Sequence, residues 1–97
     1  MHCKLQDRVA IVTGASGGIG LGIAEAYARE GAKVCLAARN NEALDQAASR
    51  IVSAGGKAIA VRTDVTSEDE VAHVFAETAS AFGQIDILVN NAGVSCS

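Results

Sequence analysis

The sequence predicts an α/β fold in which a parallel sheet is covered by helices on both faces. Four short apolar runs alternate with three helical patterns, which is the order produced by crossover connections between parallel strands. The first run, Val9–Thr13, is apolar at consecutive positions, as in a strand buried on both faces. A chain of 97 residues that is 49% hydrophobic and 20% charged fits one domain over residues 1–97.

Four strands are expected at the apolar runs. They are Val9–Thr13, Lys33–Ala38, Ala58–Thr63 and Ile87–Asn90, the last of which follows the turn-forming pair Gly83-Gln84. Right-handed crossovers then predict the strand order 3-2-1-4, with the first two helices on one face and the third on the other. Because the chain ends soon after the fourth strand, that strand is expected to be an open edge.

Apolar residues at helical spacing predict the first two helices. The first is expected to begin within residues 16–19 and to stop at Gly31, with Glu25 and Arg29 facing away from the core. The second is expected to end before Gly55-Gly56. The side chains that these helices should bury are Ile19, Ile23, Tyr27, Leu44, Ala47, Ala48 and Ile51.

The third helix carries a recognisable start and stop. Ser67 with Glu70 three residues later predicts a capping box, in which each residue satisfies the other's backbone N–H, and Gly83 should close the helix. Its expected buried stripe is Val71, Val74, Phe75 and Phe82.

A glycine-rich segment joins the first strand directly to the first helix. Residues without side chains at such a junction let the backbone turn tightly and approach a pyrophosphate, which the free N–H groups and the dipole of the helix stabilise. A flexible turn without a ligand is the alternative. The residues expected to bind a dinucleotide cofactor here are Thr13, Gly14, Ser16, Gly17, Gly18, Ile19 and Gly20.

The spacing of Gly14, Gly18 and Gly20 resembles the TGxxxGxG motif of the short-chain dehydrogenase/reductase family. Asp64-Val65, after the third strand, resembles the Asp-hydrophobe pair with which that family contacts the adenine. The resemblance covers essentially the whole chain. It implies a Rossmann-like three-layer fold, truncated after the fourth strand, and a nicotinamide dinucleotide cofactor.

A third motif lies near the end of the chain. Asn90-Asn91-Ala92-Gly93 resembles the NNAG motif of the same family. The resemblance implies that asparagine of this motif braces the central sheet, while the backbone of Ala92 and Gly93 borders the cofactor ribose. The alternative for Asn90-Asn91 is a simple turn after a strand.

Arg39 bears on the choice between NADP and NAD. An acidic residue at the end of the second strand would accept a hydrogen bond from the ribose 2′-OH of NAD and repel a 2′-phosphate. Here the neutral Ala38 is followed by Arg39, whose guanidinium matches phosphate oxygens, so NADP is favoured. The alternative is that Arg39 is a solvated residue near the end of the strand. Many NADP-preferring relatives also have a second basic residue within the glycine-rich segment, but position 17 here is Gly17.

The groups that would perform the family's chemistry are not found in this sequence. The family uses Tyr and Lys in a YxxxK pattern, with a Ser and an Asn, to polarise and protonate a carbonyl. Tyr27 is followed four residues later by Gly31 and is expected in the core, so no catalytic residue is assigned. The chain is expected to end before the catalytic segment.

Other chemistries and partners find little support. His2, His73 and the three cysteines show no metal-ligand spacing and no disulfide framework, which favours a reducing cytoplasm. A net charge of -3 without a basic cluster argues against nucleic acid, and no stretch is long and apolar enough for a membrane.

Three interpretations follow. The first is part of an NADP-dependent oxidoreductase that transfers hydride between the nicotinamide and an alcohol or ketone, with this stretch alone binding cofactor without turnover. The second is a non-catalytic dinucleotide-binding module. The third is an interaction module, and self-association through the exposed fourth-strand edge is expected.

Overall fold

Strands and helices alternate along the chain, as the computed structural model shows for the residues it describes: 6–14, 18–39, 41–64 and 66–89. The elements in chain order are β1 (Val9–Thr13), α1 (Gly18–Arg29), β2 (Lys33–Ala38), α2 (Asn41–Ser53), β3 (Lys57–Arg62), α3 (Glu68–Phe82) and β4 (Ile87–Val89). The predicted β1 and β2 have the observed bounds. The third strand lies one residue earlier than predicted, and Asn90 lies outside the described residues.

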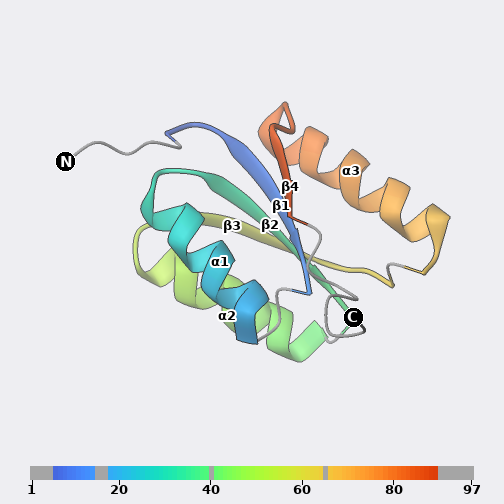
Figure 1. Ribbon diagram of the computed structural model, residues 1–97, viewed down its shortest axis with the longest axis horizontal. Helices are drawn as coiled ribbons and strands as arrows, with labels where there is room; N and C mark the ends of the chain where they lie inside the picture. The colour runs from blue at the N-terminus through green and yellow to red at the C-terminus, as the bar shows by residue number, and fades with distance from the viewer. Residues whose placement is uncertain (1–5, 15–17, 40, 65, 90–97) are drawn as a thin grey trace.

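The strands form one parallel sheet in the order β3-β2-β1-β4, as predicted. Helices α1 and α2 cover one face and α3 covers the other (Figure 1). Val12 of β1 lies opposite Leu36 of β2 and Val89 of β4. Because all strands run in the same direction, their carboxyl ends meet at one edge of the sheet.

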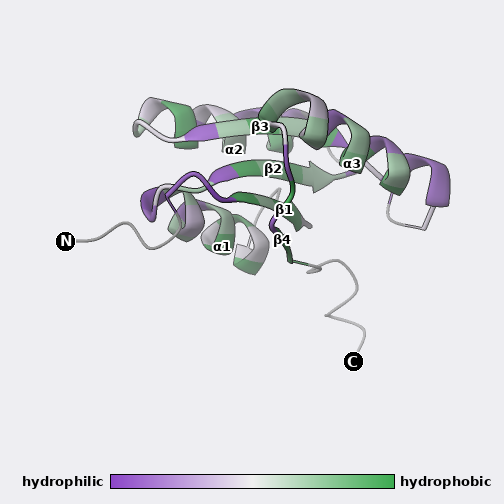
Figure 2. Ribbon diagram, turned by 90° about the horizontal axis from the view of Figure 1, so that it is seen from above, coloured by the Kyte–Doolittle hydropathy of each residue, from purple (hydrophilic) through white to green (hydrophobic). Residues whose placement is uncertain are grey.

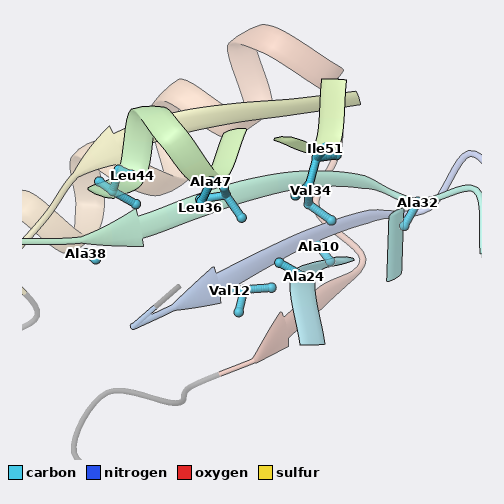
Figure 3. Packing of buried hydrophobic residues seen from close by; sticks show 10 residues of the cluster. All are labelled: Ala10, Val12, Ala24, Ala32, Val34, Leu36, Ala38, Leu44, Ala47 and Ile51. Carbon is cyan, nitrogen blue, oxygen red and sulfur yellow. The ribbon is translucent and has the colours of Figure 1, made fainter. Parts of the chain in front are cut away.

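The core has two layers because successive residues of a strand point to opposite faces. Beneath α1 and α2 the buried cluster is Ala10, Val12, Ala24, Ala32, Val34, Leu36, Ala38, Leu44, Ala47 and Ile51 (Figure 3). Beneath α3 it is smaller and consists of Ile11, Cys35, Ala37 and Val74. Figure 2 shows β1 and β2 hydrophobic along most of their length, with hydrophilic residues dense at the start of α3. The consecutive apolar residues of β1 are therefore shared between both layers.

Helix α1 buries a different set of residues from the one predicted. Ile19 is 72% exposed, whereas Gly20 and Ala24 are the buried residues and Ile23 and Tyr27 are half-buried against the core. Small residues on the contact face let the helix approach the sheet closely, and Ile19 lies in the first turn of the helix. The prediction that Ile19 is a core residue was wrong.

Helix α3 follows its predicted bounds but not its predicted stripe. Val74 is buried, yet Phe75 is 39% exposed and the fully buried second residue is Thr78. The Thr78 hydroxyl donates a hydrogen bond to the Val74 carbonyl oxygen at 2.7 Å, which satisfies its polarity inside the core. Gly83 closes the helix in the left-handed conformation, as predicted.

Only half of the predicted capping box forms. The Ser67 hydroxyl accepts a hydrogen bond from the Glu70 backbone N–H at 3.4 Å. The Glu70 carboxylate does not return to Ser67 and instead accepts a hydrogen bond from the backbone N–H of Asp64 at 2.8 Å. Ser67 N–H donates to the Asp64 carbonyl oxygen at 3.0 Å, so its own donor is already satisfied.

Candidate functional site

The sequence-predicted site residues in the described part of the chain gather where the strands end. Thr13 ends β1 and Gly14 follows it, Arg39 follows β2, and Asp64 comes two residues after β3. The Thr13 hydroxyl donates to the Val89 carbonyl oxygen at 3.3 Å, which ties the end of β1 to the end of β4. The fold therefore brings these residues, distant in sequence, to one edge of the sheet.

The turn between β1 and α1 requires glycine for its backbone. Gly14 has φ 64° and Gly18 has φ 59°, a left-handed conformation that costs an L-residue about 1–2 kcal/mol. A Cβ added at Gly18 would meet no atom within 4 Å, so the space above it is open. The glycine is thus needed for its conformation, and the backbone here is accessible to a ligand. Ser16 and Gly17 lie outside the described residues.

The first turn of α1 differs from that of the other two helices. Glu42 lies in the first turn of α2, and Glu68, Asp69 and Glu70 lie in the first turn of α3, where they offset the positive end of the helix dipole. The first turn of α1 contains no acidic residue. Its free N–H groups and positive dipole end therefore suit an anion. Gly20, the last glycine of the motif, is buried and permits close packing of helix on strand.

Asp64 is held in place by three neighbouring residues. Its Oδ1 accepts hydrogen bonds from Thr66 N at 2.9 Å and from Thr66 Oγ1 at 2.6 Å. Its backbone N–H is bound by Glu70, and its carbonyl oxygen by Ser67. Among the described residues this leaves Oδ2 free to accept a hydrogen bond from a ligand. Sequence reasoning found Asp64 and assigned Glu70 only to a capping box with Ser67. It missed Thr66, although an Asp side chain often accepts a hydrogen bond from the backbone two residues on.

The charge at this edge is a carboxylate flanked by arginines. The hydrogen bonds from Thr66 are the main cause that lowers the pKa of Asp64, and attraction from Arg39 and Arg62 adds to them. Asp64 is therefore ionised at neutral pH. Arg39 is exposed, and Ala38 before it is nearly buried. Sequence reasoning did not select Arg62.

A cavity lies away from this edge of the sheet. It measures about 340 Å³ and is lined by residues near the carboxyl ends of α1 and α2, including Arg29, Arg50 and Gly55. Helix carboxyl ends carry partial negative charge, and Arg50 already pairs with Glu25 at 3.2 Å. This cavity is a poor site for an anion, in contrast to the start of α1.

Other chemistries find no site among the described residues. No group of three or more His, Cys, Asp or Glu there could hold a metal ion, and no described helix has the length and apolar character to cross a bilayer. His73 is exposed on α3, and Tyr27 packs against the core. Burial raises the pKa of the free Cys35 thiol, which makes it a poor nucleophile.

Several predicted residues cannot be placed. Val65 and the segment Asn90, Asn91, Ala92 and Gly93 lie outside the described residues. The described residues nevertheless fit a dinucleotide: an open glycine turn and an uncompensated helix start suit two phosphates, and an ionised Asp64 suits an amino group.

Residues 8–97 match the sequence profile of the family described as short chain dehydrogenase. An uncharacterised oxidoreductase of Staphylococcus saprophyticus is 48% identical over 97 residues, which are 97% of this chain and 41% of the relative. A hydroxysteroid dehydrogenase from Escherichia coli superposes with a TM-score of 0.91 at 42% identity, covering 94% of this chain and 39% of that one. L-Sorbose reductase from Gluconobacter frateurii, solved with NADPH and L-sorbose, gives a TM-score of 0.91 at 42% identity, covering 97% and 36%. The chain thus spans about two fifths of the length of these proteins.

Proposed function

The chain belongs to the short-chain dehydrogenase family, and from this premise we propose that it binds a nicotinamide adenine dinucleotide along the carboxyl edge of its sheet. The observation that carries the proposal is the left-handed backbone of Gly14 and Gly18 at the start of α1, a helix without acidic residues in its first turn. Backbone N–H groups there would donate to the two linked phosphates, whose charge the helix dipole stabilises.

The proposal gives each part of the cofactor its own residues. The pyrophosphate binds to the glycine-rich segment, residues 13–20. The adenine amino group donates a hydrogen bond to Asp64, and Val65 contacts the adenine. The ribose borders Ala92 and Gly93, while Asn90 and Asn91 brace the sheet. Arg39 binds the 2′-phosphate, so the cofactor is NADP rather than NAD.

The proposed activity of the whole protein is an NADP-dependent oxidoreduction of an alcohol or ketone. The nicotinamide supplies or accepts the hydride, while residues 1–97, as one coenzyme-binding domain, hold and orient the coenzyme without turning it over. The packing of Tyr27 against the core supports this division, because the described residues then offer no phenol at the carboxyl edge to protonate a carbonyl. A buried free thiol at Cys35 supports a cytoplasmic location.

Fluorescence titration of the purified chain with NADPH and NADH tests the assignment. Wild type should bind NADPH more tightly than NADH. Arg39→Asp should weaken the binding of NADPH but not that of NADH, because it replaces a phosphate-binding cation with an anion that repels the phosphate. Equal weakening of the binding of both cofactors would show that Arg39 does not contact the 2′-phosphate. Failure of the wild-type chain to bind either cofactor would refute the proposed function.

A second proposal concerns association between copies of the chain. β4 forms the edge of the described sheet, pairs with β1 alone and carries Leu88 with 51% of its surface exposed. An apolar edge with unpaired backbone groups favours pairing with another chain. We therefore propose that this chain self-associates through β4.

A further inference from the structure

We propose that Arg62 is a second determinant of cofactor specificity, and that its guanidinium joins that of Arg39 in binding the 2′-phosphate that distinguishes NADP from NAD. The inference rests on the proposed function, because it concerns a coenzyme bound along the same edge of the sheet. The glycine-rich segment, residues 13–20, contains no Lys or Arg, so a second cation for the 2′-phosphate has to come from another element.

The side chains of β3 identify the face on which Arg62 lies. Ala58 and Ala60 pack against the cluster beneath α1 and α2, whereas Ile59 and Val61 pack against the cluster beneath α3. Residues of a strand alternate between faces, so Arg62 belongs to the face of Ala58 and Ala60. Helix α1 starts on that same face (Figure 1). Arg62 therefore lies on the side of the sheet where the phosphates are expected.

The strand register places Arg62 opposite Ala38, the residue that precedes Arg39. Arg62 pairs with Ala38 across β3 and β2, and Thr63 N–H donates to the Ala38 carbonyl oxygen at 2.8 Å. Neighbouring strands lie about 4.8 Å apart, so the backbone of Arg62 is about that far from the residue that precedes Arg39. Arg39 lies in a bend beyond the end of β2, so the alternation of strand residues does not fix its side, and both arginines lie near enough to the Asp64 carboxylate to help lower its pKa.

The charges near these arginines leave space for an anion. Both arginines are exposed, and the salt bridges found among the described residues join Arg8 to Asp86 and Arg50 to Glu25 instead. Arg39 and Arg62 both act on the carboxylate of Asp64, where their attraction helps the Thr66 hydrogen bonds to lower its pKa. Two guanidinium groups and one carboxylate carry a net positive charge, which a phosphate would neutralise.

Calorimetric titration with adenosine 2′,5′-bisphosphate and adenosine 5′-monophosphate isolates the role of the 2′-phosphate, because the two ligands differ only in that group. Arg62→Gln keeps most of the side-chain stem and removes the charge. Lys57→Gln is the matched control, because Lys57 is exposed at the opposite end of the same strand. Arg39→Gln provides the comparison, and circular dichroism verifies that every variant is folded.

Arg62→Gln should weaken binding of the 2′,5′-bisphosphate about tenfold, the low end for a hydrogen bond to a charged group because the site is exposed, and leave binding of the 5′-monophosphate unchanged. Lys57→Gln should change the affinity for neither ligand. If Arg62→Gln does not fold, Arg62→Lys, which retains the charge, should keep a reduced preference for the bisphosphate.

Three results would overturn the inference. Loss of the preference in Arg39→Gln but not in Arg62→Gln would leave the proposed function standing with Arg39 alone. If Arg62→Gln weakened the binding of both ligands equally, Arg62 would affect the contact between Asp64 and the adenine, which both ligands share, and not the 2′-phosphate. Failure of the wild-type chain to bind either nucleotide would refute the proposed function itself.

Discussion

Two glycines four residues apart show how differently one residue type serves this chain. Gly18 has φ 59° at the start of α1, whereas Gly22 lies within the same helix without a positive φ. A Cβ at either position would meet no atom within 4 Å, so steric contact does not separate them. The difference is one of backbone conformation alone.

Paired alanine substitutions test this difference. Gly18→Ala should lower the free energy of unfolding by about 1–2 kcal/mol because Ala is strained in the left-handed conformation. Gly22→Ala should raise it by about 0.5–1 kcal/mol because Ala has the higher helix propensity. Urea unfolding of both variants measures the two effects, and equal changes of the same sign would contradict the assigned conformations.

The sequence indicates which residues carry chemistry better than it indicates what holds them. Asp64 could be selected through its resemblance to the family's Asp-hydrophobe pair, and Arg39 through its position directly after the buried second strand. Thr66 and Glu70 act on Asp64 through hydrogen bonds whose geometry depends on the turn before α3. The role proposed for Arg62 could not be predicted, because it rests on pairing with Ala38, a contact between separate strands.

At the scale of single elements, β4 is short, and Asp86 just before it adds hydrogen bonds to the start of β1. Asp86 Oδ2 accepts hydrogen bonds from Val9 N at 2.9 Å and from Gln84 Nε2 at 2.7 Å, and Asp86 N–H donates to the Val9 carbonyl oxygen at 2.9 Å. Oδ1 lies 3.6 Å from Arg8 Nη1. The Val9 N–H is the main cause that lowers the pKa of Asp86 below its ordinary value.

This attachment should depend on pH. Because the native pKa of Asp86 is lowered, its stabilising contribution is fully present above the ordinary Asp pKa of about 4 and is lost as pH falls through the native value. Asp86→Asn should therefore be less stable than wild type at neutral pH, and the difference should shrink on acidification. Urea midpoints measured across this range provide the test, and a difference that does not change with pH would argue against a role for the charge.

Element boundaries were predictable where a local signal marks them. Gly83 ends α3, and Gly55-Gly56 follow α2, because glycine interrupts helices at low cost. Buried faces were less predictable. Ile19 and Phe75 fit the helical spacing but are exposed, and the pattern alone does not reveal that Ala24 and Thr78 have the sheet contacts.

At the scale of the whole molecule, the strand order was predictable because right-handed crossovers leave few alternatives. The proposed self-association follows from the same order, since β4 is an edge strand of the described sheet. Leu88→Lys should reduce self-association, because a charged residue on an edge strand disfavours pairing. Analytical ultracentrifugation of wild type and variant over a range of concentrations measures the effect, and a monomeric wild type would contradict the proposed role of β4.

The central claim is that the glycine turn before α1 binds the linked phosphates of a dinucleotide. Backbone amide NMR spectra of the chain, recorded during titration with NADPH, test it most directly. We predict large shifts for the amides of Gly14, Gly18 and Gly20, and little change for Gly55 and Gly56 beside the large cavity at the opposite edge. Shifts at Gly55 and Gly56 with the three turn glycines unchanged would contradict the claim.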